Sequence, residues 1–202
     1  MVVELILVVV TGGFGSGKTT VTGAFEKLGC VVFDSDRIVS GLYEKKNVQK
    51  ILAKEFGAEV IARGKVNRRA LAEKAFSDKL ALGKLNRLVH PLVFSEIRKK
   101  VKTFSRKKIV VVEVPLFFES PVANSLHPDF VVVAWCEKKK AIARLKRKGF
   151  SGNEILARMK AQLPLSEKKR LADFVVDNSK SAEFARMQVK KFFDRIITHG
   201  QA

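Results

Sequence analysis

The apolar residues of this chain are concentrated in short, nearly continuous runs that are rich in Val and Ile. Strands that are buried on both faces have this composition, because helices cover both sides of a parallel sheet. The pattern therefore predicts an α/β fold with a five-stranded parallel sheet and helices on both faces. The runs cover Leu5 to Val10, Val31 to Phe33, Ile109 to Val114, Phe130 to Trp135 and, more weakly, Phe174 to Val176.

Helical spacing of apolar residues fills the segments between these runs. After the first run, the spacing predicts a helix that Gly29 ends, because glycine readily adopts the left-handed conformation past a helix terminus. A last helix is predicted to close the chain. The apolar residues in register are Val21, Ala24, Phe25 and Leu28 in the first of these helices, and Ala185, Val189, Phe192 and Ile196 in the last.

Two stretches depart from the simple strand–helix alternation. Residues 37–104 have no strong strand signal and are predicted to form a helical insertion, whose last helix His90-Pro91 would open, since proline fits a first helical position. Lys138 to Leu163 reads as a basic helical pair. Within it, Ser151-Gly152-Asn153-Glu154 has the form of a capping box, so a new helix is expected to begin at about Gly152.

Composition and charge limit the classes of protein. The 202 residues are enough for one main domain, and 39 Lys+Arg against 20 Asp+Glu give a net charge of +19, which favours polyanionic partners. The apolar segment Met1 to Val10 is too short to span a bilayer and carries Glu4, so it is expected to be a buried strand of a cytoplasmic protein. Cys30 and Cys136 are expected to be reduced core residues.

A glycine-rich segment, Gly12-Gly13-Phe14-Gly15-Ser16-Gly17-Lys18-Thr19, lies between the first apolar run and the helix after it. It has the P-loop pattern in the strand–helix setting that this motif requires. Backbone N–H groups and the helix N-terminus of such a loop surround the phosphates of a nucleotide. Lys18 is expected to bridge the β- and γ-phosphates, and the Thr19 hydroxyl to hold Mg²⁺. The alternative is a glycine-rich turn with an incidental lysine.

Carboxylates follow two further strands at the same edge of the predicted sheet. The second run ends in Asp34-Ser35-Asp36, where a carboxylate can accept the proton of an attacking hydroxyl. We assign Asp34 as this base and Asp36 to substrate or Mg²⁺-water contacts, although Asp36 could instead cap the next helix. Near the end of the third run, Glu113 could act near the metal, and Glu119, which follows that run, is either a functional or a surface carboxylate.

Arginines in the basic stretch after the fourth run are candidates for stabilising the transferred phosphoryl group. Arg144 and Arg147 lie where a mobile lid could bring a guanidinium onto that group. The surrounding lysines leave a solvated helix face as the alternative.

These residues together resemble the dephospho-CoA kinases through most of the chain. The resemblance implies a P-loop kinase fold of nucleoside-monophosphate-kinase type, with a nucleotide-binding core (1–36, 105–136 and 166–202), a helical CoA-binding insertion (37–104) and a lid (137–165). It also implies that ATP phosphorylates the ribose 3′-hydroxyl of dephospho-CoA, the last step of coenzyme A synthesis. The matching residues are Thr11-Gly12-Gly13 through Lys18-Thr19-Thr20, Asp34-Ser35-Asp36, Phe56-Gly57, Arg68, Ala70-Leu71, Leu85-Asn86, His90-Pro91, Pro115-Leu116, Glu119, Arg144, Gln162, Ala172-Asp173 and Asn178.

By position, the resemblance assigns the base to Asp34, the phosphate lysine to Lys18 and the lid arginine to Arg144. Asp36, Arg68, His90 and Glu119 are expected on the substrate side, although His90 could merely cap its helix, and Gln162 could face solvent. Phe14 and Ser35 depart from the Ile and Ala that the family more often has, and Arg144 and Arg147 are one residue closer than the usual pair. The residues expected to bind ATP are Gly12, Gly13, Gly15, Ser16, Gly17, Lys18, Thr19, Thr20 and, near the adenine, Asn178.

Two other functions remain open from the sequence. One is another small-molecule or nucleoside-monophosphate kinase of the same fold. The other is a nucleic-acid-binding ATPase, which the charge and the basic stretches Arg98 to Lys108 and Lys138 to Lys148 suggest. With 15 Phe but one Tyr and one Trp, mostly inside apolar runs, base-stacking platforms are not evident. We therefore expect a small-molecule substrate, and neither nucleic acid nor a membrane as partner.

Overall fold

The computed structural model describes residues 5–75, 79–104 and 109–199. The chain divides into two compact units. The first unit comprises Met1–Asp34 and Val101–Ala202, and the second unit comprises Ser35–Lys100.

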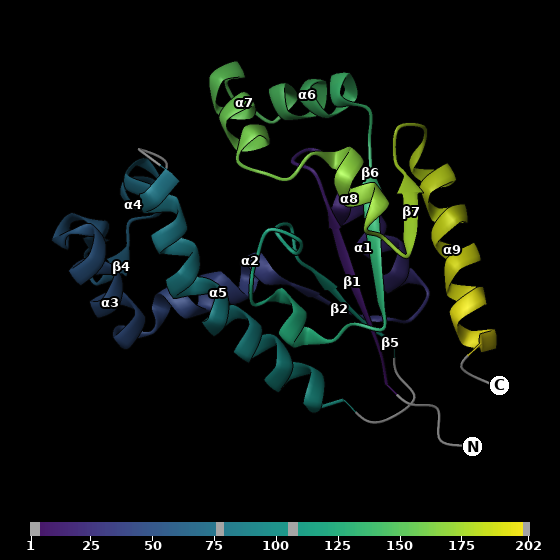
Figure 1. The fold of residues 1–202 in the computed structure, drawn as a ribbon, viewed down its shortest axis with the longest axis horizontal. Coiled ribbons are helices and arrows are strands. Elements are labelled where there is room, and N and C mark those ends of the chain that lie inside the picture. Colours follow the sequence, from purple (N-terminus) through teal and green to yellow (C-terminus); the bar gives the residue numbers. More distant parts are fainter. Residues whose placement is uncertain (1–4, 76–78, 105–108, 200–202) are drawn as a thin grey trace. The chain divides into compact units, whose positions relative to one another are not determined.

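Within the described residues, the first unit is built on a five-stranded sheet of order β2-β5-β1-β6-β7. Every neighbouring pair is parallel, and β1 is central (Figure 1). The five predicted strands and their parallel arrangement are thus confirmed. The strands are β1 (Ile6–Gly12), β2 (Val31–Asp34), β5 (Ile109–Glu113), β6 (Phe130–Trp135) and β7 (Phe174–Asp177).

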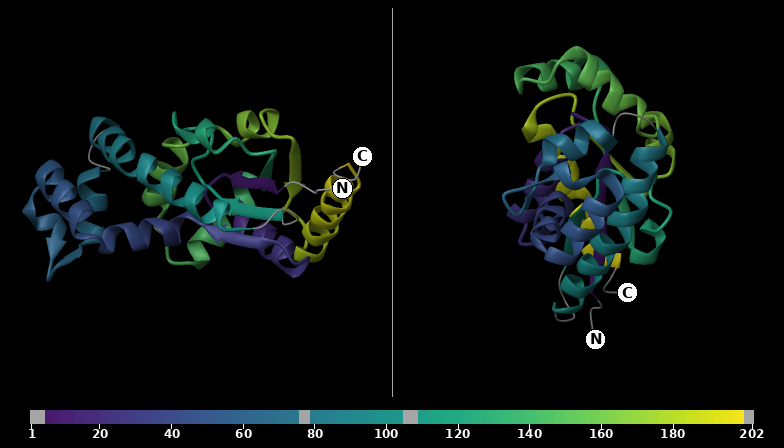
Figure 2. Two further views of the ribbon diagram at one scale, coloured as in Figure 1. Left: turned by 90° about the horizontal axis from the view of Figure 1, so that it is seen from below. Right: turned by 90° about the vertical axis from the view of Figure 1, so that its left-hand side faces the viewer.

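Helices of the first unit follow the strands. In the view of Figure 1, α8 lies in front of the sheet and α1 behind it, and α9 lies beside β7 in Figure 1 and in the left view of Figure 2. The helices are α1 (Lys18–Lys27), α6 (Lys138–Arg147), α7 (Gly152–Lys160), α8 (Leu165–Arg170) and α9 (Ala182–His199), with a 3-10 turn, η2, at Ala123–Leu126.

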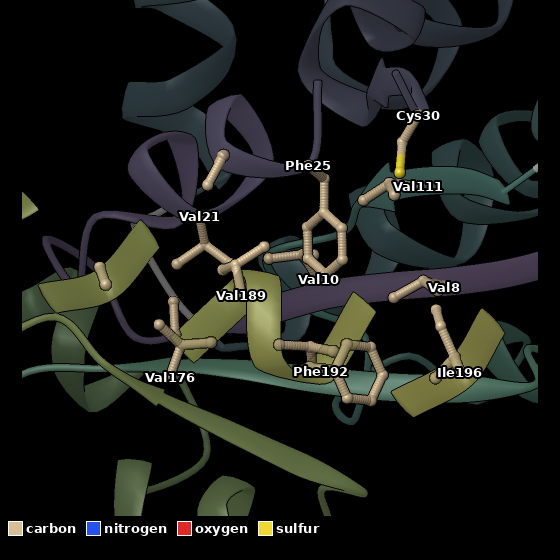
Figure 3. Close-up of a cluster of buried hydrophobic side chains, with 14 residues drawn as sticks. Val8, Val10, Val21, Phe25, Cys30, Val111, Val176, Val189, Phe192 and Ile196 are labelled. Atoms are coloured by element: carbon tan, nitrogen blue, oxygen red, sulfur yellow. The ribbon is translucent and has the colours of Figure 1, made fainter. Parts of the chain in front are cut away.

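The core between the sheet, α1 and α9 explains the sequence pattern. Val8 and Val10 point into it from β1, with Phe25 of α1 and Phe192 of α9 packed against them (Figure 3). The intervening residue Val9 is also fully buried. Because alternate strand residues face opposite sides, burial at successive positions shows that both faces of the sheet are covered.

Both cysteines are free and buried, as expected. Burial raises the pKa of the Cys30 thiol to about 11. At pH 8 only about one such thiol in a thousand is therefore a thiolate, the reactive form.

We expect Cys30 to react with an aromatic disulfide reagent at pH 8 many times more slowly in the folded protein than in 6 M guanidinium chloride. A rate in the folded protein close to that of a free thiol would contradict this burial.

The second unit is mainly helical. Its apolar cluster includes Leu52 and Phe56 of α3, Val60 of the 3-10 turn after α3, and Leu71 of α4. Its helices are α2 (Ser35–Glu44), α3 (Lys46–Phe56), α4 (Arg68–Ala75) and most of α5 (Lys79–Lys102), with a 3-10 turn, η1, at Ala58–Val60.

A short antiparallel hairpin interrupts the helical run that the sequence predicts for residues 37–104. It pairs β3 (Ile61–Ala62) with β4 (Lys65–Val66). Arg63 and Gly64, which join the strands, both have positive φ, of 50° and 73°, as in the two-residue turns whose twist suits a hairpin. Strands of two residues are too short to show any alternation of apolar and polar positions, so the sequence does not predict them.

The prediction that His90-Pro91 opens a helix is wrong. Pro91 lies inside α5, which continues through it to Lys102. Proline removes one backbone hydrogen bond there, but Val89, Val93 and Phe94 are buried around it. The packing of these side chains outweighs the local preference of proline for a helix start.

The predicted helix start at Gly152 is confirmed. Ser151 is the N-cap of α7, and its hydroxyl accepts a hydrogen bond of 3.2 Å from the backbone N–H of Glu154.

Among the helices of the described ranges, none combines the length and the apolar composition needed to cross a bilayer.

Candidate active site

The P-loop connects the central strand to α1. β1 ends at Gly12 and α1 begins at Lys18. Gly15 and Gly17 between them have φ of 80° and 83°, the left-handed region that favours glycine. The turn is closed by a hydrogen bond of 3.1 Å from the Ser16 N–H to the Gly13 carbonyl. The glycines that the motif requires are therefore needed for the backbone path of the loop.

Asn178 supports the loop from the end of β7. Its side chain is buried, and its amide nitrogen donates to the carbonyls of Ser16 at 2.8 Å and of Gly17 at 3.3 Å. A Cβ atom on Gly17 would overlap this amide. The side chain of Asn178 thus fixes the phosphate loop, and the expected contact of this residue with adenine stays a prediction.

Lys18 and Thr19 begin α1 on the loop. The half-buried Lys18 ammonium donates to the carbonyls of Gly13 at 3.2 Å and Gly12 at 3.5 Å. Thr19 is exposed, and the N–H of Thr20 donates to the Gly17 carbonyl at 2.9 Å. The ammonium therefore lies beside the first residues of the P-loop. Its flexible side chain would let it move with a bound phosphate.

Arg144 of α6 lies beside the same loop. Its guanidinium donates to the Asn178 carbonyl at 2.8 Å and contacts the Cys136 sulfur at 3.5 Å. These contacts tie it to the ends of β7 and β6. Arg147 is exposed. Of the two arginines proposed from the sequence, the structure brings Arg144 to the P-loop.

Asp34 ends β2 at the sheet edge where the P-loop begins. It is half-buried and is paired in register with Glu113 of β5, which in turn is paired with Val10 of β1. One strand separates β2 from β1, so their axes lie about 10 Å apart at the usual strand spacing. Glu113 is 3.4 Å from the Thr22 hydroxyl of α1. Two carboxylates and the phosphate loop therefore share one edge of the sheet in one unit.

The expectation that Asp36 is part of the strand end is corrected by the structure. β2 ends at Asp34, and α2 begins at Ser35, so Asp36 lies exposed in the first turn of α2. An acidic side chain is favourable there because the helix N-terminus carries partial positive charge.

Arg68 and His90 also belong to the second unit. Arg68 begins α4 and is exposed, with its guanidinium 5.9 Å from the centre of the Tyr43 ring. Burial raises the pKa of Tyr43, and the nearby Arg68 charge lowers it in part. His90 lies within α5, where its ring meets that of Phe94 edge-on at 6.2 Å. His90 therefore does not cap a helix start.

Glu119 has partners that the sequence did not reveal. One of its carboxylate oxygens lies 2.7 Å from the ammonium of Lys168, which is fully buried, and accepts the N–H of Leu163 at 2.9 Å. Lys168 also donates to the Pro115 carbonyl at 3.0 Å, to which the Thr11 hydroxyl donates at 3.2 Å. The pair links the P-loop strand, the turn after β5 and the segment before α8.

Burial lowers the pKa of Lys168, and Glu119 raises it part of the way back. Lys168 cannot be recognised as a buried residue from the sequence, because it stands in the basic run Glu167-Lys168-Lys169-Arg170, which resembles a solvated helix face. The contact between Lys168 and Glu119 is therefore seen in the structure but cannot be predicted from the sequence.

A cavity of about 560 Å³ adjoins the P-loop between α6, α7 and α8. Its walls are largely apolar and include Trp135. Gln162, two residues after the end of α7, lines it and accepts a hydrogen bond from the N–H of Phe14 at 2.9 Å, so this side chain faces the P-loop rather than only solvent. The other lining residues are Gly13, Phe14, Ser16, Cys136, Glu137, Lys138, Ala141, Leu156, Met159, Lys160, Leu163, Pro164 and Leu165.

Comparison with known proteins identifies the family. The dephospho-CoA kinase family model matches residues 6–183. A dephospho-CoA kinase of Carboxydothermus hydrogenoformans is 37% identical over 191 residues, which cover 92% of this chain and 91% of the relative.

Two solved structures agree in fold. The crystal structure of TT1252 from Thermus thermophilus matches with a TM-score of 0.81 and 30% identity, over 95% of this chain and 98% of that one. The dephospho-CoA kinase from Campylobacter jejuni matches with a TM-score of 0.59 and 26% identity, over 94% and 96% of the two chains. The predicted P-loop kinase fold is confirmed, and the chain belongs to the dephospho-CoA kinase family.

Proposed function

We propose that this chain transfers the γ-phosphoryl group of ATP to the ribose 3′-hydroxyl of dephospho-CoA in the cytoplasm. The observation that carries the proposal is the shared sheet edge of the P-loop, at the end of β1, and Asp34, at the end of β2. A phosphoryl donor held by the loop and a hydroxyl acceptor held by the carboxylate would meet there, as ligands of open α/β sheets do.

The loop holds the donor. Its backbone N–H groups and the N-terminus of α1 surround the phosphates, and Lys18 bridges the β- and γ-phosphates. The Thr19 hydroxyl, exposed at the start of α1, would hold Mg²⁺, an ion that usually has few protein ligands. The ion would neutralise negative charge on the phosphates. The remaining members of the ATP site are Gly12, Gly13, Gly15, Ser16, Gly17, Thr20 and Asn178.

Asp34 provides the base. Its carboxylate takes the proton of the 3′-hydroxyl as the ribose oxygen forms a bond to the γ-phosphorus. The bond from that phosphorus to the β,γ-bridging oxygen breaks, and ADP leaves with the electron pair. General-base assistance of this kind contributes about 10² to 10⁴ in rate.

The remaining residues bind and enclose the substrates. Arg144 stabilises the charge on the transferred group, and residues 137–165 close over ATP as a lid, which excludes water from the reaction. Residues 37–104 bind the acceptor, with Asp36, Arg68 and His90 among its contacts. Glu119, whose oxygen is bonded to Lys168 and Leu163, serves more as a support of the site than as a substrate contact.

An acceptor panel tests the proposal. We expect ATP consumption to depend on dephospho-CoA and to be at background with adenosine monophosphate, shikimate or no acceptor. Equal rates with adenosine monophosphate, or without acceptor, would refute the assignment. The nucleic-acid-binding alternative predicts instead that duplex or single-stranded DNA stimulates ATP consumption, with an affinity that falls steeply with salt concentration.

A further inference from the structure

Phe14, the aromatic residue of the P-loop, packs against the helix pair α6 and α7. The Phe14 ring meets the Phe150 ring, which lies between α6 and α7, edge-on at a centroid distance of 5.2 Å. The guanidinium of Arg158 lies 5.2 Å from the centre of the Phe14 ring and 5.1 Å from that of Phe150. One cation of α7 thus contacts two rings, one from the phosphate loop and one from the helix pair.

The backbone of Phe14 takes part in the same contact. Its N–H donates to the Gln162 side chain at 2.9 Å. Arg158 lies in the last turn of α7, and Gln162 follows two residues after the helix ends at Lys160. The last turn of α7 and the residues just after it therefore contact both the ring and the backbone of one P-loop residue.

Arg158 is oriented by one further group. Its guanidinium makes an ion pair of 2.8 Å with Glu154, one turn earlier in α7. A guanidinium has five N–H donors and can stack on a ring while it binds an anion. Its contacts with Glu154 and the two rings therefore leave N–H donors for phosphate oxygens at the loop that carries Phe14.

We propose that Phe14 is a positioning residue that docks α7 on the P-loop and thereby brings Arg158 to the γ-phosphate of bound ATP. This inference rests on the proposed function and extends it. Phe14 acts through the helix it holds, whereas Arg158 contacts the phosphoryl group. The expected lid arginine Arg144 of α6 is hydrogen-bonded to residues just after β6 and β7, so Arg158 supplies a second guanidinium from α7.

Kinetics of single and double variants test the coupling. We expect Phe14→Ala to lower kcat about tenfold or more, Phe14→Tyr to retain kcat within threefold, and Arg158→Ala to lower kcat at least as much as Phe14→Ala. Because Phe14 acts through Arg158, the double variant should be no slower than Arg158→Ala alone. Multiplicative effects of the two substitutions would overturn the proposal, as would an unchanged kcat of Phe14→Ala.

Two comparisons exclude a general loss of structure. Phe184→Ala removes a similar contact, in which Lys180 lies 4.5 Å from the ring centre, and should keep kcat within twofold. The affinity for ADP, which lacks the γ-phosphate, should change less than threefold in Phe14→Ala. If Phe14→Ala does not fold, Phe150→Ala tests the same contact from the helix side.

Fluorescence separates this inference from the proposed function. Trp135, the one tryptophan of the chain, lines the cavity between the P-loop and α7. We expect a non-hydrolysable ATP analogue to change its emission in the unmodified protein, and the change to be at least halved in Phe14→Ala at saturating analogue. This readout needs no acceptor, so it holds even if dephospho-CoA is not the substrate. An equal emission change in both proteins would contradict the docking role.

Discussion

Replacing Asp34 by Asn is expected to lower kcat by at least about a hundredfold, because general-base catalysis contributes about 10² to 10⁴ in rate. The amide has nearly the same shape as the carboxylate, but it cannot accept the proton of the acceptor hydroxyl. The P-loop is untouched, so binding of ATP should remain within about threefold of its original strength. Steady-state kinetics with dephospho-CoA and calorimetric titration with an ATP analogue measure the two quantities.

A matched variant controls for the loss of one negative charge. Asp194 of α9 is exposed and pairs with Lys190 on the same helix, so Asp194→Asn should leave kcat within about twofold. If Asp34→Asn turns over at a normal rate, Asp34 is not the base. If it loses ATP binding as well, the carboxylate supports the fold of the site rather than the chemistry.

Replacing Lys168 by Met is expected to lower the free energy of unfolding by about 3 to 5 kcal/mol, the usual effect of removing one partner of a buried ion pair. Lys168 is fully buried and holds Glu119 and the Pro115 carbonyl. Without the ammonium, a carboxylate that is largely shielded from water keeps only the N–H of Leu163 as its hydrogen-bond donor among the described residues. Urea denaturation followed by circular dichroism measures the loss.

Replacing Glu119 as well as Lys168 tests whether the loss of stability comes from an unpaired buried charge. Lys168→Met combined with Glu119→Gln removes the stranded charge, so the double variant should regain more than half of the lost stability. Arg170→Met, at an exposed position two residues later, should change stability by less than about 0.5 kcal/mol. A loss in Lys168→Met as small as in Arg170→Met would show that the pair is not buried in solution.

The sheet and the phosphate loop could be predicted because their signals are local and strong. Burial on both faces requires apolar residues at successive strand positions, and Val8, Val9 and Val10 show this directly in the sequence. The P-loop requires glycines at fixed places, since Gly15 and Gly17 adopt a backbone conformation that other residues avoid. Ser151 likewise fixed the start of α7 through one hydroxyl.

The remaining features depend on contacts between residues far apart in the sequence. Lys168 and Glu119 are separated by 49 positions, and neither sequence context indicates a buried partner. The path of α5 through Pro91 depends on packing around the helix, and the contact of Phe14 with Phe150 and Arg158 depends on how α7 returns to the loop. Local propensity carries no information about such partners.

The position of the transferred phosphate tests the central claim most directly. Dephospho-CoA and ATP are incubated with the protein, and the product is examined by two-dimensional proton–phosphorus magnetic resonance. The P-loop and Asp34 acting on one phosphoryl group predict one new phosphomonoester at the ribose 3′ position for each ATP consumed. ATP consumption without a new ester, or an ester at another position, would contradict this account.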